Sequence, residues 1–102
     1  MKTADLIGTA LDWAVASAEG VIYHGLAWAN YSTNWAQGGP IIENEELHLI
    51  QRPIRGGKSG TKEWFAEGRE GHEGTGPTPL IAAMRCYVAS KLGNDVNVPE
   101  VL

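Results

Sequence analysis

The chain has 102 residues, of which 43% are hydrophobic and 20% are charged, and its formal net charge is −4. These values are typical of one globular domain and exclude an intrinsically disordered chain. General nucleic-acid binding requires a broad cationic surface, and this acidic chain has only 8 Lys and Arg. We therefore expect no general nucleic-acid binding.

The compartment is indicated by the cysteine content and by the N-terminal segment. Cys86 is the single cysteine, so no internal disulfide can form, as is usual in a reducing compartment. Asp5 and Asp12 interrupt the N-terminal apolar stretch, and no apolar run is long enough to span a membrane. We expect one soluble domain over residues 1–102, without membrane association, whose tail (about 94–102) is extended.

Helices are predicted at both ends of the chain. Residues 3–19 carry apolar side chains at helical spacing, with Thr3 as the predicted N-cap and Gly20 as the stop. In the last helix, Thr78 is the predicted cap, Pro79 takes the first helical position, and Gly93 ends the helix.

The middle of the chain predicts strands and loops. Residues 21–29 and 61–67 are rich in aromatic and β-branched side chains, which favours strands. Turn-forming residues predict loops at 30–40, 52–60 and 68–76. Residues 41–51 predict a strand pair interrupted at 43–46, with a short helix over 43–50 as the alternative. The predicted fold class is α+β: a small antiparallel β-sheet packed with an N-terminal and a C-terminal helix.

The last helix is apolar on more than one face. Ala82, Cys86 and Ala89 lie opposite the face that carries Leu80 and Met84, where a surface helix normally has charged residues. We expect that a domain of this size cannot cover a helix on every side, and we therefore predict a homo-oligomer, most simply with two-fold symmetry. In the alternative interpretation, small residues on a solvated face simply favour helix formation.

Three segments together resemble the NinX family of lambdoid bacteriophages, a domain of unknown function. They are residues 11–16 (LDWAVA), 31–43 (YSTNWAQGGPIIE) and 76–93 (GPTPLIAAMRCYVASKLG), in this order along nearly the whole chain. The resemblance implies a small accessory protein encoded among phage genes and made in the cytoplasm of the infected bacterium. It supplies no catalytic residues.

A ligand site is predicted around residues 31–43. Aromatic rings can stack on a base, and glycines allow backbone N–H groups to approach a phosphate. Arg85 could direct its donors at an anion, or form a structural ion pair with Asp12 or Glu43. In the alternative interpretation, Trp35 anchors a structural loop and residues 38–40 only turn the chain. The candidate ligand residues are Tyr31, Ser32, Thr33, Trp35, Gly38, Gly39, Glu43 and Arg85.

Other site types have weaker support. The basic segment 52–62 does not match a phosphate-binding P-loop, because Arg52 stands where the first glycine is required; a solvated loop is the favoured interpretation. His24, His48 and His72 form no metal-ligand pair, although Glu70, His72 and Glu73 are close in sequence. We expect no metal, no cofactor and no catalytic set, and favour an inert, packed Cys86 over a nucleophile.

The functional hypothesis is a non-catalytic phage accessory protein that binds or sequesters a small anionic, nucleotide-like ligand of the host, as an anti-defence protein would. The absence of a catalytic constellation and the mixture of aromatic, glycine and cationic residues favour it. The alternative is a protein–protein interaction module that acts on a host or phage protein through its apolar helix face. A binding protein is favoured over an enzyme.

Overall fold

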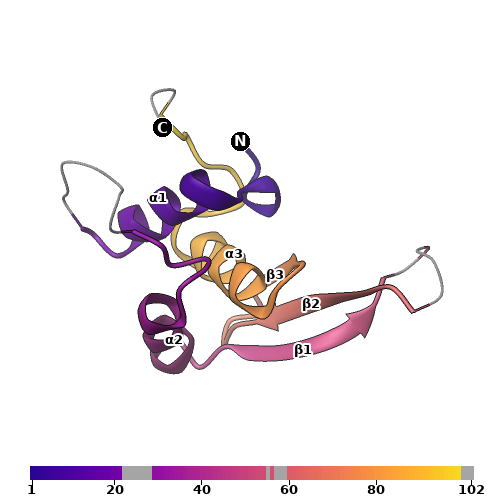
Figure 1. Ribbon diagram of the computed structural model, residues 1–102. Helices are drawn as coiled ribbons and strands as arrows, with labels where there is room; N and C mark the ends of the chain where they lie inside the picture. Colours follow the sequence, from indigo (N-terminus) through magenta and orange to yellow (C-terminus); the bar gives the residue numbers. More distant parts are fainter. Residues whose placement is uncertain (22–28, 55, 57–59, 100–102) are drawn as a thin grey trace.

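A computed structural model describes residues 1–21, 29–54, 56 and 60–99. In this part of the chain, a 3-10 turn (η1, Thr3–Asp5) precedes helix α1 (Gly8–Ala18), and helix α2 covers Trp35–Asn44. Three strands follow, β1 (His48–Pro53), β2 (Lys62–Glu67) and β3 (Glu73–Gly76), and then helix α3 (Pro79–Leu92) (Figure 1). The α+β class is confirmed. Most of the strand predicted at 21–29 lies outside the described residues.

The three strands form one antiparallel sheet in the order β1-β2-β3. Phe65 of β2 pairs with Ile50 on one side and with Thr75 on the other. β3 is short, so β1 and β2 continue beyond it as a two-stranded ribbon that points away from the helices (Figure 1). The strand predicted at 61–67 is confirmed by β2.

Helix α3 is the centre of the molecule. It packs against all three strands, α1, α2 and η1, and nine of its residues are buried. Thr78 Oγ1 accepts the Ile81 N–H at 3.1 Å, Pro79 begins the helix, and Gly93 follows it with φ +87°, so the predicted boundaries are confirmed.

Burial of α3 within one chain removes the argument for a two-fold interface. Ala82, Cys86 and Ala89 face neighbouring elements of the same chain and not solvent. A central helix flanked by a sheet on one side and by α1 and α2 on the other can therefore be covered in a chain of this length. Self-association of the chain stays a prediction, without this support.

The N-terminal segment differs from the predicted helix. Ile7 is extended and Gly8 has φ +58°, so α1 begins at residue 8. Thr3 does not cap α1; its Oγ1 donates to the Gly93 carbonyl at 2.6 Å. Backbone pairing of Lys2 with Asp95 places the N-terminus beside residues 94–96. The predicted stop at Gly20 is confirmed by its φ of +72°.

The loop predicted at 30–40 is confirmed for residues 30–34 but is wrong from residue 35 onward, and the strand predicted at 41–42 is wrong, because α2 covers Trp35–Asn44. Asn34 is its N-cap and accepts the Ala36 N–H at 2.8 Å. Ile41 is buried against the core, and this tertiary packing holds a helix that contains two glycines and Pro40. Residues 38–40 therefore do not turn the chain.

The glycine-rich segment 68–76, predicted as a loop, ends in strand β3. An added Cβ at Gly74 would contact the Ala82 carbonyl oxygen and would lie 2.5 Å from the Cys86 amide nitrogen. Only glycine permits this close approach of β3 to α3, and composition alone does not distinguish such a strand from a loop.

Candidate functional site

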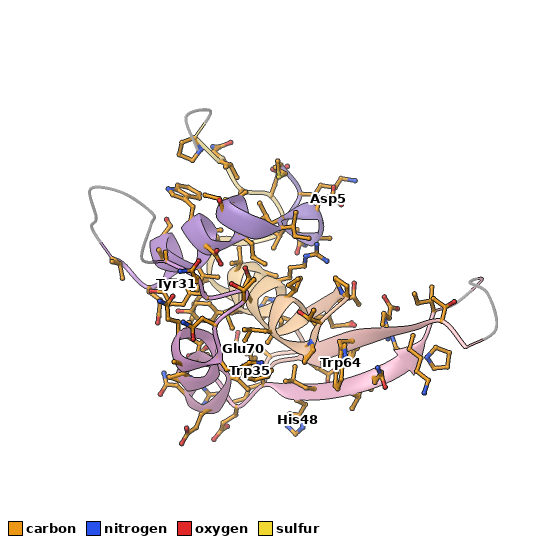
Figure 2. The ribbon with its side chains drawn as sticks, viewed as in Figure 1. Asp5, Tyr31, Trp35, His48, Trp64 and Glu70 are labelled. Carbon is orange, nitrogen blue, oxygen red and sulfur yellow. The ribbon has the colours of Figure 1, made fainter. Side chains whose placement is uncertain are left out.

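The eight candidate ligand residues do not converge on one site. Tyr31 and Gly38 are buried structural residues that contact each other: a Cβ at Gly38 would lie 2.5 Å from the Tyr31 carbonyl oxygen. Gly39 is half-buried one position further along α2. Figure 2 shows Tyr31 and Trp35 near the start of α2.

Three of the candidates line one small cavity. Ser32, Thr33 and Trp35 face the first turn of α3 across a space of about 230 Å³. Trp35 is 53% exposed, so it does not anchor the segment to the core. The sequence hypothesis of a ligand-facing tryptophan therefore agrees with its position, and binding there stays a prediction.

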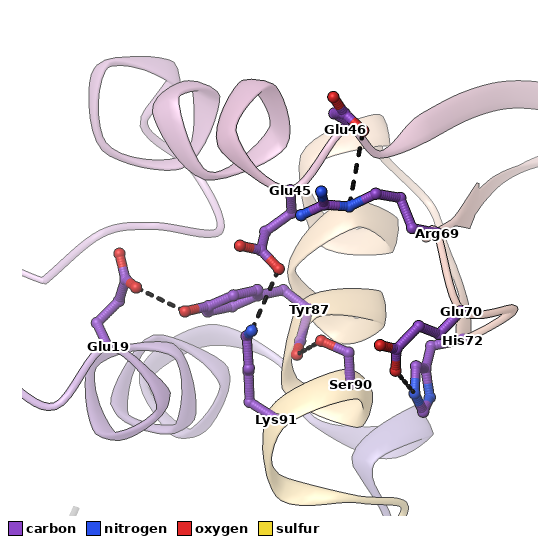
Figure 3. A network of polar contacts seen from close by, with 9 residues as sticks. All are labelled: Glu19, Glu45, Glu46, Arg69, Glu70, His72, Tyr87, Ser90 and Lys91. Carbon is purple, nitrogen blue, oxygen red and sulfur yellow. Dashed lines mark hydrogen bonds and ion pairs between the residues drawn. The ribbon is translucent and has the colours of Figure 1, made fainter.

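Glu43 belongs to a different, acidic cavity of about 420 Å³ between α2, the end of α1 and α3. Glu19, Glu43 and Glu45 all line it. Figure 3 shows the polar contacts beside it: Tyr87 Oη donates to Glu19 at 2.5 Å, and Lys91 pairs with Glu45 at 3.4 Å. Three carboxylates disfavour an anion here, so Glu43 and Arg85 do not serve one anionic ligand.

Arg85 lies on another side of α3, in the wall of a cavity of about 530 Å³. Its Nε donates to the Leu6 carbonyl at 2.8 Å, and one terminal nitrogen donates to the Thr75 carbonyl at 2.8 Å. These two bonds fix the guanidinium between η1 and β3. The predicted ion pairs with Asp12 and Glu43 are absent: Asp12 Oδ1 accepts the Ser32 N–H at 2.8 Å instead, and Glu43 lines the acidic cavity.

Arg85 forms no ion pair with any carboxylate in the described part of the chain. Burial lowers the pKa of its guanidinium, and the charge of Asp5 partly offsets this effect. The ordinary pKa of arginine is so high that the group stays charged at neutral pH. A partly desolvated cation without a carboxylate partner is a typical receptor for an anion.

The cavity contains further residues that the sequence did not indicate. Lys2 joins it from the N-terminus and Arg52 from β1. The Arg52 guanidinium lies 4.2 Å from the centroid of the Phe65 ring, and its Nε lies 3.3 Å from Glu63. We call this space the Arg85 cavity; its lining residues include Lys2, Arg52, Phe65, Glu73, Arg85 and Asp95. The scattered lysine and arginine residues are the one feature of the sequence that indicated such a cavity.

Cys86 is fully buried and its Sγ donates to the His72 carbonyl at 3.3 Å. Burial raises the pKa of its thiol to about 11, and the charges of Glu67 and Glu73 add to this effect. The thiolate is therefore scarce at neutral pH, as expected for a packed residue and not for a nucleophile.

We predict that Cys86 in the native protein reacts with iodoacetamide at pH 8 roughly 100-fold more slowly than in urea-unfolded protein, because labelling requires opening of the fold. The unfolded thiol ionises first as the pH rises, so this group's contribution to stability is intact below about pH 9 and is lost towards pH 11. Mass spectrometry of the alkylated protein gives both rates. Equal rates would show that the α3–β3 contact is open in solution.

The described part of the chain contains no candidate metal site: no group of three or more His, Cys, Asp or Glu side chains there could hold an ion. His72 lies 3.8 Å from Glu70 in an exposed position, and His48 lies on β1. His24 lies outside the described residues. The described helices also include none that is long and apolar enough to cross a membrane.

The fold and its cavities describe a small α+β protein whose central helix carries an unpaired guanidinium into a partly cationic cavity. The family described as bacteriophage P22 NinX matches residues 2–91, and the chain therefore belongs to this family of phage proteins. The resemblance seen in residues 11–16, 31–43 and 76–93 is confirmed. No curated protein matches the chain.

Proposed function

We propose that this phage protein binds a small anionic, nucleotide-like ligand in the Arg85 cavity and does not transform it. The volume of about 530 Å³ lies within the range typical of small-molecule pockets. The single observation that carries the proposal is Arg85, a half-buried guanidinium held by two carbonyls and paired with no carboxylate of the described chain.

The orientation of Arg85 supports recognition of a phosphate. Nε and one terminal nitrogen are used by Leu6 and Thr75, so the second terminal nitrogen is available for a ligand without rearrangement of the side chain. A preorganised donor binds more tightly than a free one because less side-chain entropy is lost. Arginine in such a position recognises phosphate oxygens through directed, charge-assisted hydrogen bonds.

The charge balance of the cavity favours a ligand of low charge. Lys2 and Arg52 add two cations to Arg85, but Arg52 is already paired with Glu63 at 3.3 Å. Glu73 and Asp95 add two carboxylates, but Asp95 is already paired with the N-terminal amino group at 3.2 Å. The excess of positive charge is small, which suits a monophosphate or a phosphodiester better than a triphosphate.

Sequestration is the role that we infer for such binding. A protein that binds a host signalling nucleotide tightly lowers its free concentration in the infected bacterium by mass action. Small proteins of many folds can act in this way, so this step rests on analogy and on the family's origin in phages. A cytoplasmic location in the infected host is part of the same proposal.

Thermal unfolding with a panel of nucleoside monophosphates and cyclic dinucleotides tests the proposal. A matching ligand at about 100 times its Kd should stabilise the protein by about 2.7 kcal/mol, which for a domain of this size raises Tm by roughly 10–20 °C. Arg85→Gln should weaken binding by roughly 10- to 100-fold, the value of a charge-assisted hydrogen bond. No shift with any member of the panel would contradict the proposal.

The matched control is Arg69→Gln. Arg69 is an exposed arginine that pairs with Glu46 at 3.6 Å and lies outside the Arg85 cavity (Figure 3). The Arg69→Gln variant should bind ligand like the original protein. Equal loss of binding in both variants would indicate nonspecific attraction between charges. Because Arg85→Gln also removes two hydrogen bonds of the fold, its stability without ligand is measured beside the titration.

The alternative function, a protein-interaction module, has one specific feature in its favour. β1 is an edge strand of the sheet, and its Ile50 is 54% exposed. Exposed edges of this kind can pair with a strand of another protein. The apolar face of α3 is buried, so Ile50→Lys is the change that should abolish capture of a partner. This function predicts no nucleotide-dependent rise in Tm.

A further inference from the structure

Glu73 is a carboxylate without a cation partner in the wall of the Arg85 cavity. It is the first residue of β3, it is exposed, and it forms no ion pair with any Lys, Arg or His of the described residues. A carboxylate repels a phosphate, so Glu73 disfavours a bare phosphate ion in this cavity. The same carboxylate becomes favourable when the ligand also carries hydroxyl groups, because it can accept hydrogen bonds from them.

The direction of Glu73 follows from the way β3 packs on α3. An added Cβ at Gly74 would point at the backbone of α3. Side chains alternate along a strand, so Glu73 and Thr75 lie on the opposite face of the sheet. Phe65 lies on that face too, because it pairs directly with Thr75. All three residues line the Arg85 cavity, which therefore extends from α3 past the edge of β3 onto this face.

The free edge of β3 gives a place for the phosphate. β3 is the last strand of the sheet, and a terminal nitrogen of Arg85 donates to the Thr75 carbonyl at 2.8 Å. In an antiparallel strand, the N–H and the C=O of one residue point to the same side. The Thr75 N–H therefore also points to the free edge, beside the guanidinium. A phosphate that accepts from the second terminal nitrogen of Arg85 can accept this N–H as well.

We propose that the Arg85 cavity selects ribonucleotides against their 2′-deoxy analogues, with Glu73 accepting a hydrogen bond from the 2′-hydroxyl. This inference rests on the proposed nucleotide binding and specifies the sugar of the ligand. Glu73 and Thr75 are two positions apart on one strand, so their Cα atoms are separated by about 7 Å. This separation is comparable to the length of a ribose 5′-phosphate, so a phosphate at Thr75 brings the sugar hydroxyls to Glu73.

The exposure of Glu73 sets the size of the expected discrimination. A fully buried acceptor would reject a ligand without the hydroxyl very strongly, because the acceptor would lose its hydrogen bond with water and gain none. Glu73 is exposed, so water can replace the missing hydroxyl in part. We therefore expect a roughly tenfold difference in Kd, the lower end for a hydrogen bond to a charged group.

Isothermal titration calorimetry with eight nucleotides tests the proposal. AMP, GMP, CMP and UMP are each compared with the 2′-deoxy analogue of the same base, so that the base and the phosphate are constant within a pair. For every base that binds, the ribonucleotide should have a Kd roughly tenfold lower than its analogue. Equal Kd values within the pairs would overturn the role of Glu73.

Glu73→Ala should change the two members of a pair in different ways. It should weaken binding of the ribonucleotide roughly tenfold, because the acceptor is lost. It should leave the 2′-deoxy analogue unchanged or bound more tightly, because a negative charge near the phosphate is removed. Equal weakening of both would indicate a structural defect and would overturn the proposal.

Glu67→Ala is the matched control. Glu67 pairs with Glu73 across the sheet and is also exposed, but it does not line the Arg85 cavity. This variant should keep the full difference between ribonucleotide and 2′-deoxy analogue. Loss of the difference in Glu67→Ala would show that the general charge of this face is responsible, which would overturn the specific role of Glu73.

Failure of this inference can be distinguished from failure of the proposed function. If the ribonucleotides and their analogues bind equally, Glu73 does not read the sugar, while anion binding in the Arg85 cavity stands. If none of the eight nucleotides binds, the selection of ribonucleotides is overturned. The cyclic dinucleotides of the thermal unfolding panel then decide the proposed function separately.

Discussion

Gly74→Ala is expected to lower the free energy of unfolding by about 3 kcal/mol, at the upper end of the values for overpacked cores. An added Cβ would contact the Ala82 carbonyl oxygen and would lie 2.5 Å from the Cys86 amide nitrogen. Both atoms belong to the backbone of α3, which cannot rotate away as a side chain can. β3 would have to separate from α3, and Phe65 and Trp64 of β2 would lose part of their pairing with β3.

Urea unfolding followed by circular dichroism measures this change, and Gly68→Ala is its matched control. A Cβ at Gly68 would meet the nearest atom, Leu47 Cδ2, at 3.5 Å, which is an ordinary contact distance. Its stability should therefore change by less than about 0.5 kcal/mol. Similar midpoints for Gly74→Ala and Gly68→Ala would show that β3 does not lie against α3 as described.

Gly38→Ala should destabilise the protein by roughly 2 kcal/mol, the second largest effect that we predict. An added Cβ would lie 2.5 Å from the Tyr31 carbonyl oxygen and 2.6 Å from Leu80 Cδ1. The Leu80 side chain can move, but the Tyr31 carbonyl belongs to the turn that leads into α2. The substitution therefore pushes α2 away from α3.

Gly39→Ala, one position further along the same helix, should have the opposite sign. A Cβ there would meet only Trp35 Cε3 at 3.9 Å, so the gain in helix propensity of roughly 0.5–1 kcal/mol is retained. Differential scanning calorimetry of the two variants gives the comparison. If residues 35–44 were a loop, the two substitutions would not differ in this way, and equal Tm values would contradict the helix.

The sequence predicted the elements whose local signals agree with their tertiary environment. The last helix has Thr78, Pro79 and Gly93 at its ends, and each acts as its chemistry suggests. α2 was missed because Gly38, Gly39 and Pro40 are poor helix formers, and only contacts from distant segments outweigh their propensity. β3 was missed for a similar reason, since Gly74 serves the approach to α3.

The arrangement of the candidate site could not be predicted from the sequence. For Arg85 the sequence left open an anion contact and a structural ion pair; the ion pairs with Asp12 and Glu43 are absent, and Arg85 lines the cavity that we propose as the nucleotide site. Lys2 lines this cavity because the N-terminus pairs with residues 94–96. Arg52 lines it because of the position of β1. Such long-range contacts leave no periodic signal in a sequence. Trp35 and Glu43 are separated because they lie near opposite ends of α2, about 12 Å apart along its axis.

The central claim is that the Arg85 cavity holds a small anionic ligand in the bacterial cell. The most direct measurement is mass spectrometry of small molecules released on denaturation, from the original protein, Arg85→Gln and Arg69→Gln purified in parallel. We predict a nucleotide-like anion in stoichiometric amount from the original protein and Arg69→Gln, and a strongly reduced amount from Arg85→Gln. Equal amounts from all three proteins, or no released anion together with no stabilisation by the nucleotide panel, would contradict the account.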